Sequence, residues 1–258
     1  IWDWSRIGQS KFVKLLSTKE LIILPVNKSK VCVSLATDSV YKLPTLISRA
    51  FHRGADYVEI RFDHKIYNNI DYALKISSKI KNKAIFTLRS KDEGGFFEGN
   101  HREQISLLRK IAKTKPMLLD IEISILKQDK DLRKFLNDNE IPVLVSFHDF
   151  RRTSNTSVLL KKFEDMSGYS NYVKLVTTAT NSKDNFKILS LYDNKINTHL
   201  IAFAMGEHGI LSRLLCALYG NSPFTYASLD KPLAPGQLEI GLMKKIYDRI
   251  VKNLKNGR

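Results

Sequence analysis

Several features are scarce or absent in this chain of 258 residues, and each absence excludes a class of protein. The only cysteines, Cys32 and Cys216, lie far apart in apolar contexts, so we expect reduced packing residues rather than a disulfide framework or a metal site. No run of 18 apolar residues occurs, and charges are spread through the first thirty residues, which argues against a membrane span and a signal peptide. The sequence therefore predicts a soluble, cytoplasmic protein with no membrane partner.

The length of the chain favours one large domain. A closed βα barrel becomes possible at about this size, and two domains are possible but not needed. The first residue is Ile1 rather than methionine, which suggests a piece of a longer polypeptide and leaves a fused partner open. We expect residues 1–258 to form a single domain in which residues 1–28 are an N-terminal extension. Phe12 to Val26 has two apolar runs around a polar turn, which predicts a β-hairpin that closes the N-terminal end of the barrel.

Positive charge strongly exceeds negative charge, with a formal net charge of +16. The lysines are nevertheless dispersed as singles and doublets, no block of five like charges occurs, and no nucleic-acid-binding motif accompanies them. A solvated lysine surface that attracts an anionic small molecule is therefore favoured. Nucleic-acid binding is the weaker alternative, and no nucleic-acid partner is expected.

Short β-rich runs recur about every 25 to 30 residues with helix-like segments between them, which is typical of repeated βα units around a parallel sheet. The expected strands are Val31 to Ala36, Tyr57 to Phe62, Ala84 to Leu88, Met117 to Glu122, Pro142 to Phe147, Tyr172 to Val176, His199 to Ala204 and Phe224 to Ala227. Amphipathic stretches include Leu43 to Arg53, Arg102 to Lys113, Asp131 to Asn139, Ser157 to Met166, Lys183 to Leu191 and Leu238 to Leu254. Eight alternations favour a (β/α)8 TIM barrel over an open doubly wound sheet, since no glycine-rich phosphate-binding pattern follows the first strand.

Five expected strands carry polar residues toward their C-terminal ends, although strands buried on both faces are usually almost wholly apolar. Because successive side chains alternate between two faces, the polar residues of each strand share one face. They are Glu59, Arg61 and Asp63; Thr87 and Arg89; Asp120 and Glu122; Ser146 and His148; and Lys174. In a barrel these strand ends form the active-site face, so the pattern predicts a shared polar cavity; a purely structural salt-bridge network is the alternative.

Lys174 lies in the middle of an apolar run, one βα unit after His148. Burial disfavours an ammonium, and a neutral amine is a nucleophile that forms imines with carbonyl compounds. The alternative is a lysine on an edge strand whose amine reaches solvent. Together the two residues indicate an imine-forming active site.

Five short motifs and one lysine follow one another along the chain in a characteristic order. They are Glu59-Ile60-Arg61-Phe62-Asp63, Thr87-Leu88-Arg89 followed by Glu93-Gly94-Gly95, Ser146-Phe147-His148-Asp149-Phe150, Lys174, the stretch from Met205 to Arg213, and Ala234-Pro235-Gly236-Gln237. In this order and spacing the chain resembles type I 3-dehydroquinate dehydratase, the imine-forming family of the shikimate pathway. The resemblance extends from Phe12 to the last expected helix.

The resemblance implies a lyase that dehydrates 3-dehydroquinate to 3-dehydroshikimate by syn elimination, the third step of the shikimate pathway toward aromatic amino acids. Lys174 would form the imine, His148 would act as general base and then general acid, and Glu93 would orient His148. The implied substrate-binding residues are Arg213 for the carboxylate, then Glu59, Arg61, Arg89, Gln237 and Ser34. The family also implies no cofactor and no metal, and a homodimer as the expected assembly.

One position departs from the family pattern. Four residues before the lid glutamine the family often has a serine that contacts substrate, and this chain has Leu233 there. Either a neighbour such as Ser228 compensates, or the loop from Ser228 to Gln237 is shifted, or affinity for substrate is modestly lower.

Two other functions compete with this interpretation. A class I aldolase would need a phosphate-binding loop after the seventh or eighth strand, where this chain has Met205 to Arg213, with an arginine suited to a carboxylate. A non-catalytic barrel that binds an anionic partner is disfavoured because Lys174, His148 and Glu93 are all present.

Overall fold

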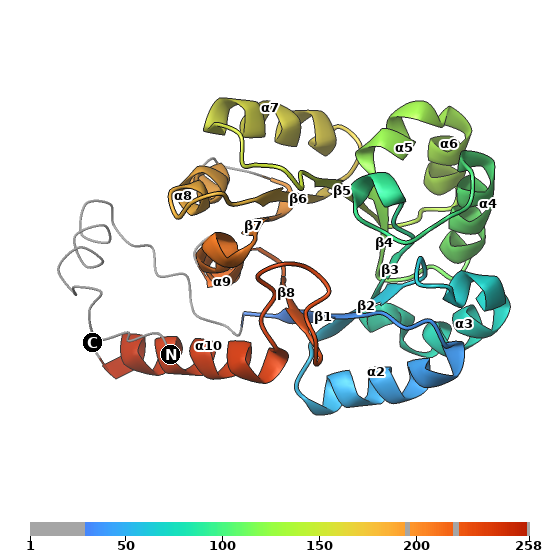
Figure 1. The fold of residues 1–258 in the computed structure, drawn as a ribbon. Coiled ribbons are helices and arrows are strands. Elements are labelled where there is room, and N and C mark those ends of the chain that lie inside the picture. The colour runs from blue at the N-terminus through green and yellow to red at the C-terminus, as the bar shows by residue number, and fades with distance from the viewer. Residues whose placement is uncertain (1–28, 194–196, 219–221, 257–258) are drawn as a thin grey trace.

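The computed structural model describes residues 29–193, 197–218 and 222–256 (Figure 1). The expected hairpin from Phe12 to Val26 lies outside the described residues. No helix within the described ranges is long and apolar enough to cross a membrane.

Strands and helices alternate along the described chain. The strands are β1 (Val31–Leu35), β2 (Tyr57–Arg61), β3 (Ala84–Thr87), β4 (Leu118–Glu122), β5 (Val143–His148), β6 (Tyr172–Thr178), β7 (His199–Met205) and β8 (Thr225–Ser228). The helices are α2 (Leu43–His52), α3 (Ile70–Ser77), α4 (His101–Ala112), α5 (Ile123–Gln128), α6 (Lys130–Asp138), α7 (Thr156–Ser167), α8 (Asp184–Leu189), α9 (Ile210–Leu218) and α10 (Ile240–Asn256). Short 3-10 segments are Val40–Lys42, Ile66–Asn69, Ser78–Lys83, Lys91–Glu93, Ser190–Asp193 and Glu207–Gly209.

The eight strands form one parallel sheet that curls into a barrel. Consecutive strands pair from β1 to β7, and β8 returns to pair with β1, which gives the order β7-β6-β5-β4-β3-β2-β1-β8. The rings of Phe203 on β7 and Tyr226 on β8 lie 6.3 Å apart and bring the two ends of the sheet together. Helices surround the strands (Figure 1). The predicted (β/α)8 barrel is confirmed.

Alternation along each strand separates an apolar outer layer from a polar interior. Outward-facing residues such as Val33, Ile60, Phe86, Leu119 and Val145 are fully buried against the helices. Each such side chain contributes about 1.5–3 kcal/mol of transfer free energy. Because the outer face supplies much of the hydrophobic core, the C-terminal part of the inner face is free to carry the charged groups of a site.

Local hydrogen bonds fix the segments next to the strand ends. Asn100 and Glu103 form a capping box at the start of α4, where Asn100 Oδ1 accepts from Glu103 N and Glu103 Oε2 accepts from Asn100 N. This cap ends the loop between β3 and α4. On the opposite side of the barrel, Ser212 Oγ of α9 accepts from Ala204 N of β7 at 2.9 Å, which locks this helix onto the strand.

Candidate active site

Polar side chains from the inner face meet in a cavity of about 90 Å³ at the C-terminal ends of the strands. The residues expected at the site all line it: Ser34, Glu59, Arg61, Arg89, Glu93, His148, Lys174, Arg213 and Gln237. They come from β1, β2, β5, β6, α9 and the loops after β3 and β8. The fold therefore gathers residues that are spread over more than two hundred positions of the sequence.

Lys174 projects from β6, an interior strand paired with both β5 and β7, and is 5% exposed. The edge-strand alternative is therefore wrong. Its Nζ lies 3.1 Å from Glu59 Oε1 and 3.1 Å from Asp120 Oδ2. The two carboxylates stabilise an ammonium that burial alone would disfavour, and they come from the polar strand faces that predicted a shared cavity.

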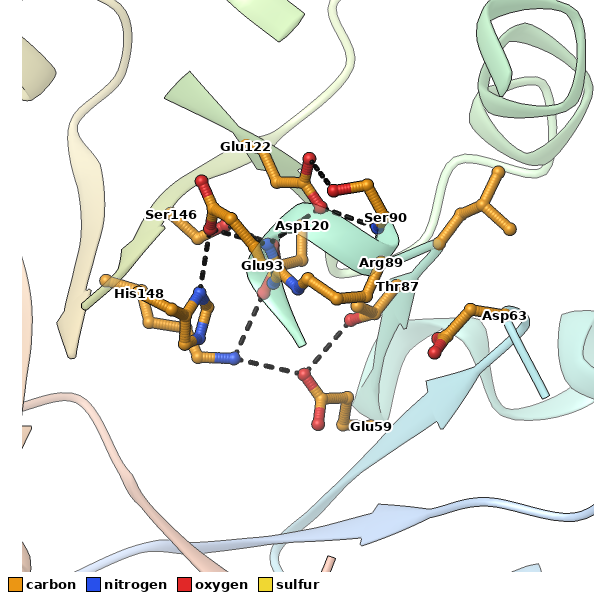
Figure 2. Close-up of polar contacts among 12 residues, drawn as sticks. Glu59, Asp63, Thr87, Arg89, Ser90, Glu93, Asp120, Glu122, Ser146 and His148 are labelled. Atoms are coloured by element: carbon orange, nitrogen blue, oxygen red, sulfur yellow. Dashed lines mark hydrogen bonds and ion pairs between the residues drawn. The ribbon is translucent and has the colours of Figure 1, made fainter. Parts of the chain in front are cut away.

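His148, the last residue of β5, forms a half-buried pair with Glu93. His148 Nδ1 lies 2.9 Å from Glu93 Oε2, and Figure 2 shows the two side chains facing each other. Burial lowers the pKa of His148 well below its usual range, and the nearby cations of Arg89 and Lys174 lower it further. Burial also raises the pKa of Glu93 to about 8, although Arg89 opposes this shift. The imidazole is thus neutral near pH 7, and the charge state of Glu93 decides which ring nitrogen carries the hydrogen.

Two glycines shape the turn that presents Glu93. Gly94 has a φ of +73°, in the left-handed region that side chains other than glycine rarely adopt. A Cβ on Gly95 would collide with the backbone carbonyl of Arg89, so the chain there passes too close for any side chain. Glycine at both positions lets the short segment Lys91–Glu93 turn its last residue back toward His148.

Arg89 is the centre of a buried carboxylate network. Its guanidinium donates to Asp120 Oδ1 at 2.6 Å and to Ser146 Oγ at 2.8 Å, and lies 3.4 Å from Glu93 Oε2 (Figure 2). Burial opposes its charge, but the adjacent carboxylates more than compensate and raise the pKa of Arg89. These donors point at protein side chains, so Arg89 holds the carboxylate network in place. The sequence predicted only a substrate contact for this residue.

Arg213 differs because it is a buried cation without a counter-ion. It is 2% exposed on α9, and burial lowers its pKa to about 10, so it remains charged near neutral pH. Within the described part of the chain it forms no salt bridge, and its Nε has no hydrogen-bond partner. Its polar contact is a 3.4 Å hydrogen bond to the carbonyl of Pro235. A buried guanidinium in this state is a binding site for an anion.

Besides its contact with Lys174, Glu59 accepts hydrogen bonds from two hydroxyl groups. Ser34 Oγ donates to its Oε2 at 2.8 Å, and Thr87 Oγ1 donates to its Oε1 at 3.0 Å. Lys174 favours its ionised form and leaves the pKa of Glu59 lowered, although burial opposes this. Arg61, also at the cavity, forms a two-pronged pair with Asp63 at 2.8 and 2.7 Å.

The loop after β8 covers the cavity, as expected of a lid. Gln237 Oε1 accepts from the backbone N–H of Leu233 at 2.8 Å, and Gly206 N donates to Pro235 O at 3.1 Å. Leu233 lines the cavity, whereas Ser228 is fully buried and is not among the lining residues, and its hydroxyl has no hydrogen-bond partner within the described ranges. Ser228 is therefore not placed to compensate for the leucine.

Asp120, Phe203 and Tyr226 are among the residues at the site to which the sequence assigned no role. Asp120 contacts Lys174, and its position on the polar face of β4 was a usable signal. Phe203 and Tyr226 also line the cavity, but an aromatic residue in a strand is more often part of the core, so the sequence carried no signal for them.

Comparison with known proteins gives consistent results. A family model described as type I 3-dehydroquinase matches residues 31–253. A 3-dehydroquinate dehydratase from Pyrococcus abyssi is 37% identical over 207 residues, which cover 80% of this chain and 90% of that protein. One from Dehalococcoides mccartyi is 36% identical over 212 residues, covering 81% and 92%. The crystal structure of 3-dehydroquinate dehydratase from Geobacillus kaustophilus has the same fold, with a TM-score of 0.79 at 22% identity, covering 88% of this chain and 92% of that one.

Proposed function

The chain belongs to the type I 3-dehydroquinase family, and from this premise we propose that it dehydrates 3-dehydroquinate to 3-dehydroshikimate through an imine at Lys174. One observation carries the proposal: a buried lysine, a half-buried neutral histidine and a buried arginine with no carboxylate partner among the described residues line the same cavity. These groups match a substrate with a ketone, an acidic C–H bond and a carboxylate.

Imine formation begins with the loss of a proton from the Lys174 ammonium. Glu59 and Asp120 each lie 3.1 Å from Nζ, within reach of that proton. The neutral amine then attacks the ring ketone, and the carboxylate returns the proton as water leaves, which produces a protonated imine. The positive nitrogen withdraws electrons from the adjacent carbon and makes its proton acidic.

Elimination follows at His148. Its neutral imidazole takes the proton from the carbon next to the imine and then returns it to the departing tertiary hydroxyl, which leaves as water. Because a single residue performs both transfers, the proton and the hydroxyl leave from the same face of the ring, a syn elimination. Water then hydrolyses the product imine, which releases 3-dehydroshikimate and restores the lysine.

Arg213 provides the anchor for the substrate carboxylate. A guanidinium donates two parallel, charge-assisted hydrogen bonds to a carboxylate. Glu59, Arg61 and Gln237 supply polar groups to the ring hydroxyls. The lid from Ser228 to Gln237 keeps water from the imine.

Borohydride reduction tests the proposed function. Reduction in the presence of 3-dehydroquinate should convert the imine into a stable secondary amine, and intact-protein and peptide mass spectrometry should place the ligand mass on Lys174. An active enzyme that carries no adduct on this residue would refute the imine. Absence of turnover would refute the assigned reaction.

Glu93→Gln is expected to change the pH dependence of the reaction. Below about pH 8 the protonated Glu93 donates to His148 Nδ1, which leaves the hydrogen on Nε2 and blocks the base. Above that pH the carboxylate accepts from Nδ1–H and Nε2 is free, so kcat/KM should rise through about pH 8. The Gln variant has no proton to lose there, so this ascending limb should move to lower pH.

The measurement is kcat/KM of both proteins between about pH 6 and 9. Glu98→Gln is the matched control, because Glu98 lies in the same loop, paired with Lys91 at the surface. It should leave the profile unchanged. An ascending limb that stays near pH 8 in Glu93→Gln would assign the titration to another group.

A further inference from the structure

We propose that Phe203 and Tyr226 form an aromatic wall that stabilises two cations of the site. Tyr226 stabilises the protonated imine on Lys174, and Phe203 stabilises the guanidinium of Arg213. The inference rests on the proposed function, because it needs the imine and the carboxylate anchor. The ring centroid of Tyr226 lies 4.2 Å from Lys174 Nζ, and that of Phe203 lies 4.2 Å from the guanidinium carbon of Arg213. Both rings are about 3% exposed, so little water screens the attraction.

The ring of Tyr226 is suited to the imine because its attraction does not depend on hydrogen bonds. The free ammonium of Lys174 has three N–H groups and donates hydrogen bonds to Glu59 and Asp120. The protonated imine keeps the positive charge but has only one N–H, so it cannot retain both of these hydrogen bonds. The electron-rich face of an aromatic ring attracts either cation. Tyr226 thus stabilises the intermediate at the step where hydrogen bonding is lost.

The ring of Tyr226, rather than its hydroxyl, carries this role. Its Oη is buried and has no hydrogen-bond partner within the described ranges. Replacing an unpartnered buried hydroxyl by hydrogen leaves the shape of the side chain and its packing almost unchanged. Tyr226→Phe keeps the ring face and is therefore the reference against which the fluorinated variants are compared.

Phe203 performs the corresponding task for the substrate anchor. Arg213 has no carboxylate partner among the described residues, and its single polar contact with Pro235 is long. The face of Phe203 offsets part of the cost of burying this charge before substrate arrives. Because the carboxylate remains bound through the reaction, weakening this contact should affect substrate affinity more than the chemical step.

A fluorination series separates this electrostatic role from packing. Phenylalanine with none, one, two or three ring fluorines is introduced at position 226, since fluorine withdraws electron density from the ring face while the shape changes little. We expect kcat to fall stepwise, by about tenfold in total, with KM nearly constant. The same series at position 203 should instead raise KM by about tenfold. Phe224 is the control, because it packs edge-on against Tyr226 and its series should change neither constant.

Each outcome is decisive. A flat series at position 226, or a loss in Tyr226→Phe as large as in the trifluoro variant, would overturn the inference while borohydride trapping of the wild-type imine still upheld the proposed function. A series at Phe224 that matched the one at Tyr226 would show a packing effect and would overturn the inference too. Absence of a trapped imine in the wild-type enzyme would overturn both proposals.

Discussion

Lys174→Ala is expected to lower kcat by about four to six orders of magnitude, because no other lysine among the described residues lines the cavity to form the covalent imine on which the later steps depend. Binding of the carboxylate at Arg213 would remain, so the loss should appear in kcat far more than in KM. The measurement is steady-state turnover of 3-dehydroquinate, together with borohydride trapping, which should yield no adduct at position 174.

Folding must be separated from chemistry in this experiment. Removing the amine leaves Glu59 and Asp120 buried without the cation between them, so the alanine variant should also be less stable. Lys174→Arg is the matched variant, since it keeps a positive charge between the carboxylates but cannot form the imine. It should fold, bind and fail to turn over. Turnover within tenfold of the wild-type rate in Lys174→Arg would contradict the proposed mechanism.

Arg213→Met is expected to have opposite effects on activity and on stability. KM should rise by about a hundredfold, because truncating one partner of a buried charged pair costs about 2–5 kcal/mol. The free protein should nevertheless become more stable, since a buried guanidinium without a carboxylate partner is replaced by an apolar side chain of similar length. A gain of about 1–2 kcal/mol corresponds to a Tm increase of about 3–8 °C.

Arg89→Met is the control, because Arg89 is equally buried but lies among Asp120, Glu122 and Glu93. Removing its charge leaves these carboxylates uncompensated, so Tm should fall, by contrast with Arg213→Met. Tm is measured by calorimetry without substrate. A Tm loss of similar size in both variants would show that Arg213 is held by structural interactions rather than kept available for an anion.

The strands were predictable because their signal is local. Each of the eight expected strands agrees with the structure to within two residues at either end, for example Tyr57 to Phe62 against β2 (Tyr57–Arg61). Burial on both faces and the alternation of side chains impose this pattern on every strand of a barrel.

The helix bounds were less predictable. A helix-like segment was expected after each strand, but no ranges were assigned for α3 (Ile70–Ser77), α5 (Ile123–Gln128) and α9 (Ile210–Leu218). Two of these helices are short. The third, α9, follows a stretch that contains glycine, and the structure places Arg213 on this helix. Tertiary packing on the strands decides such segments, because short helices have little intrinsic stability.

The sequence by itself determined the barrel and its polar interior, because strand periodicity is a property of neighbouring residues. The order of the motifs along the chain, through the family resemblance, indicated the candidate roles of Lys174, His148 and Arg213. The tertiary structure alone decided which charges meet. It placed Asp120 and Glu59 beside Lys174 and enclosed Arg89 among carboxylates. Among the described residues it left Arg213 with no carboxylate partner. The energy of a buried charge depends on groups a few ångströms away in space, and those groups come from strands that are far apart along the chain.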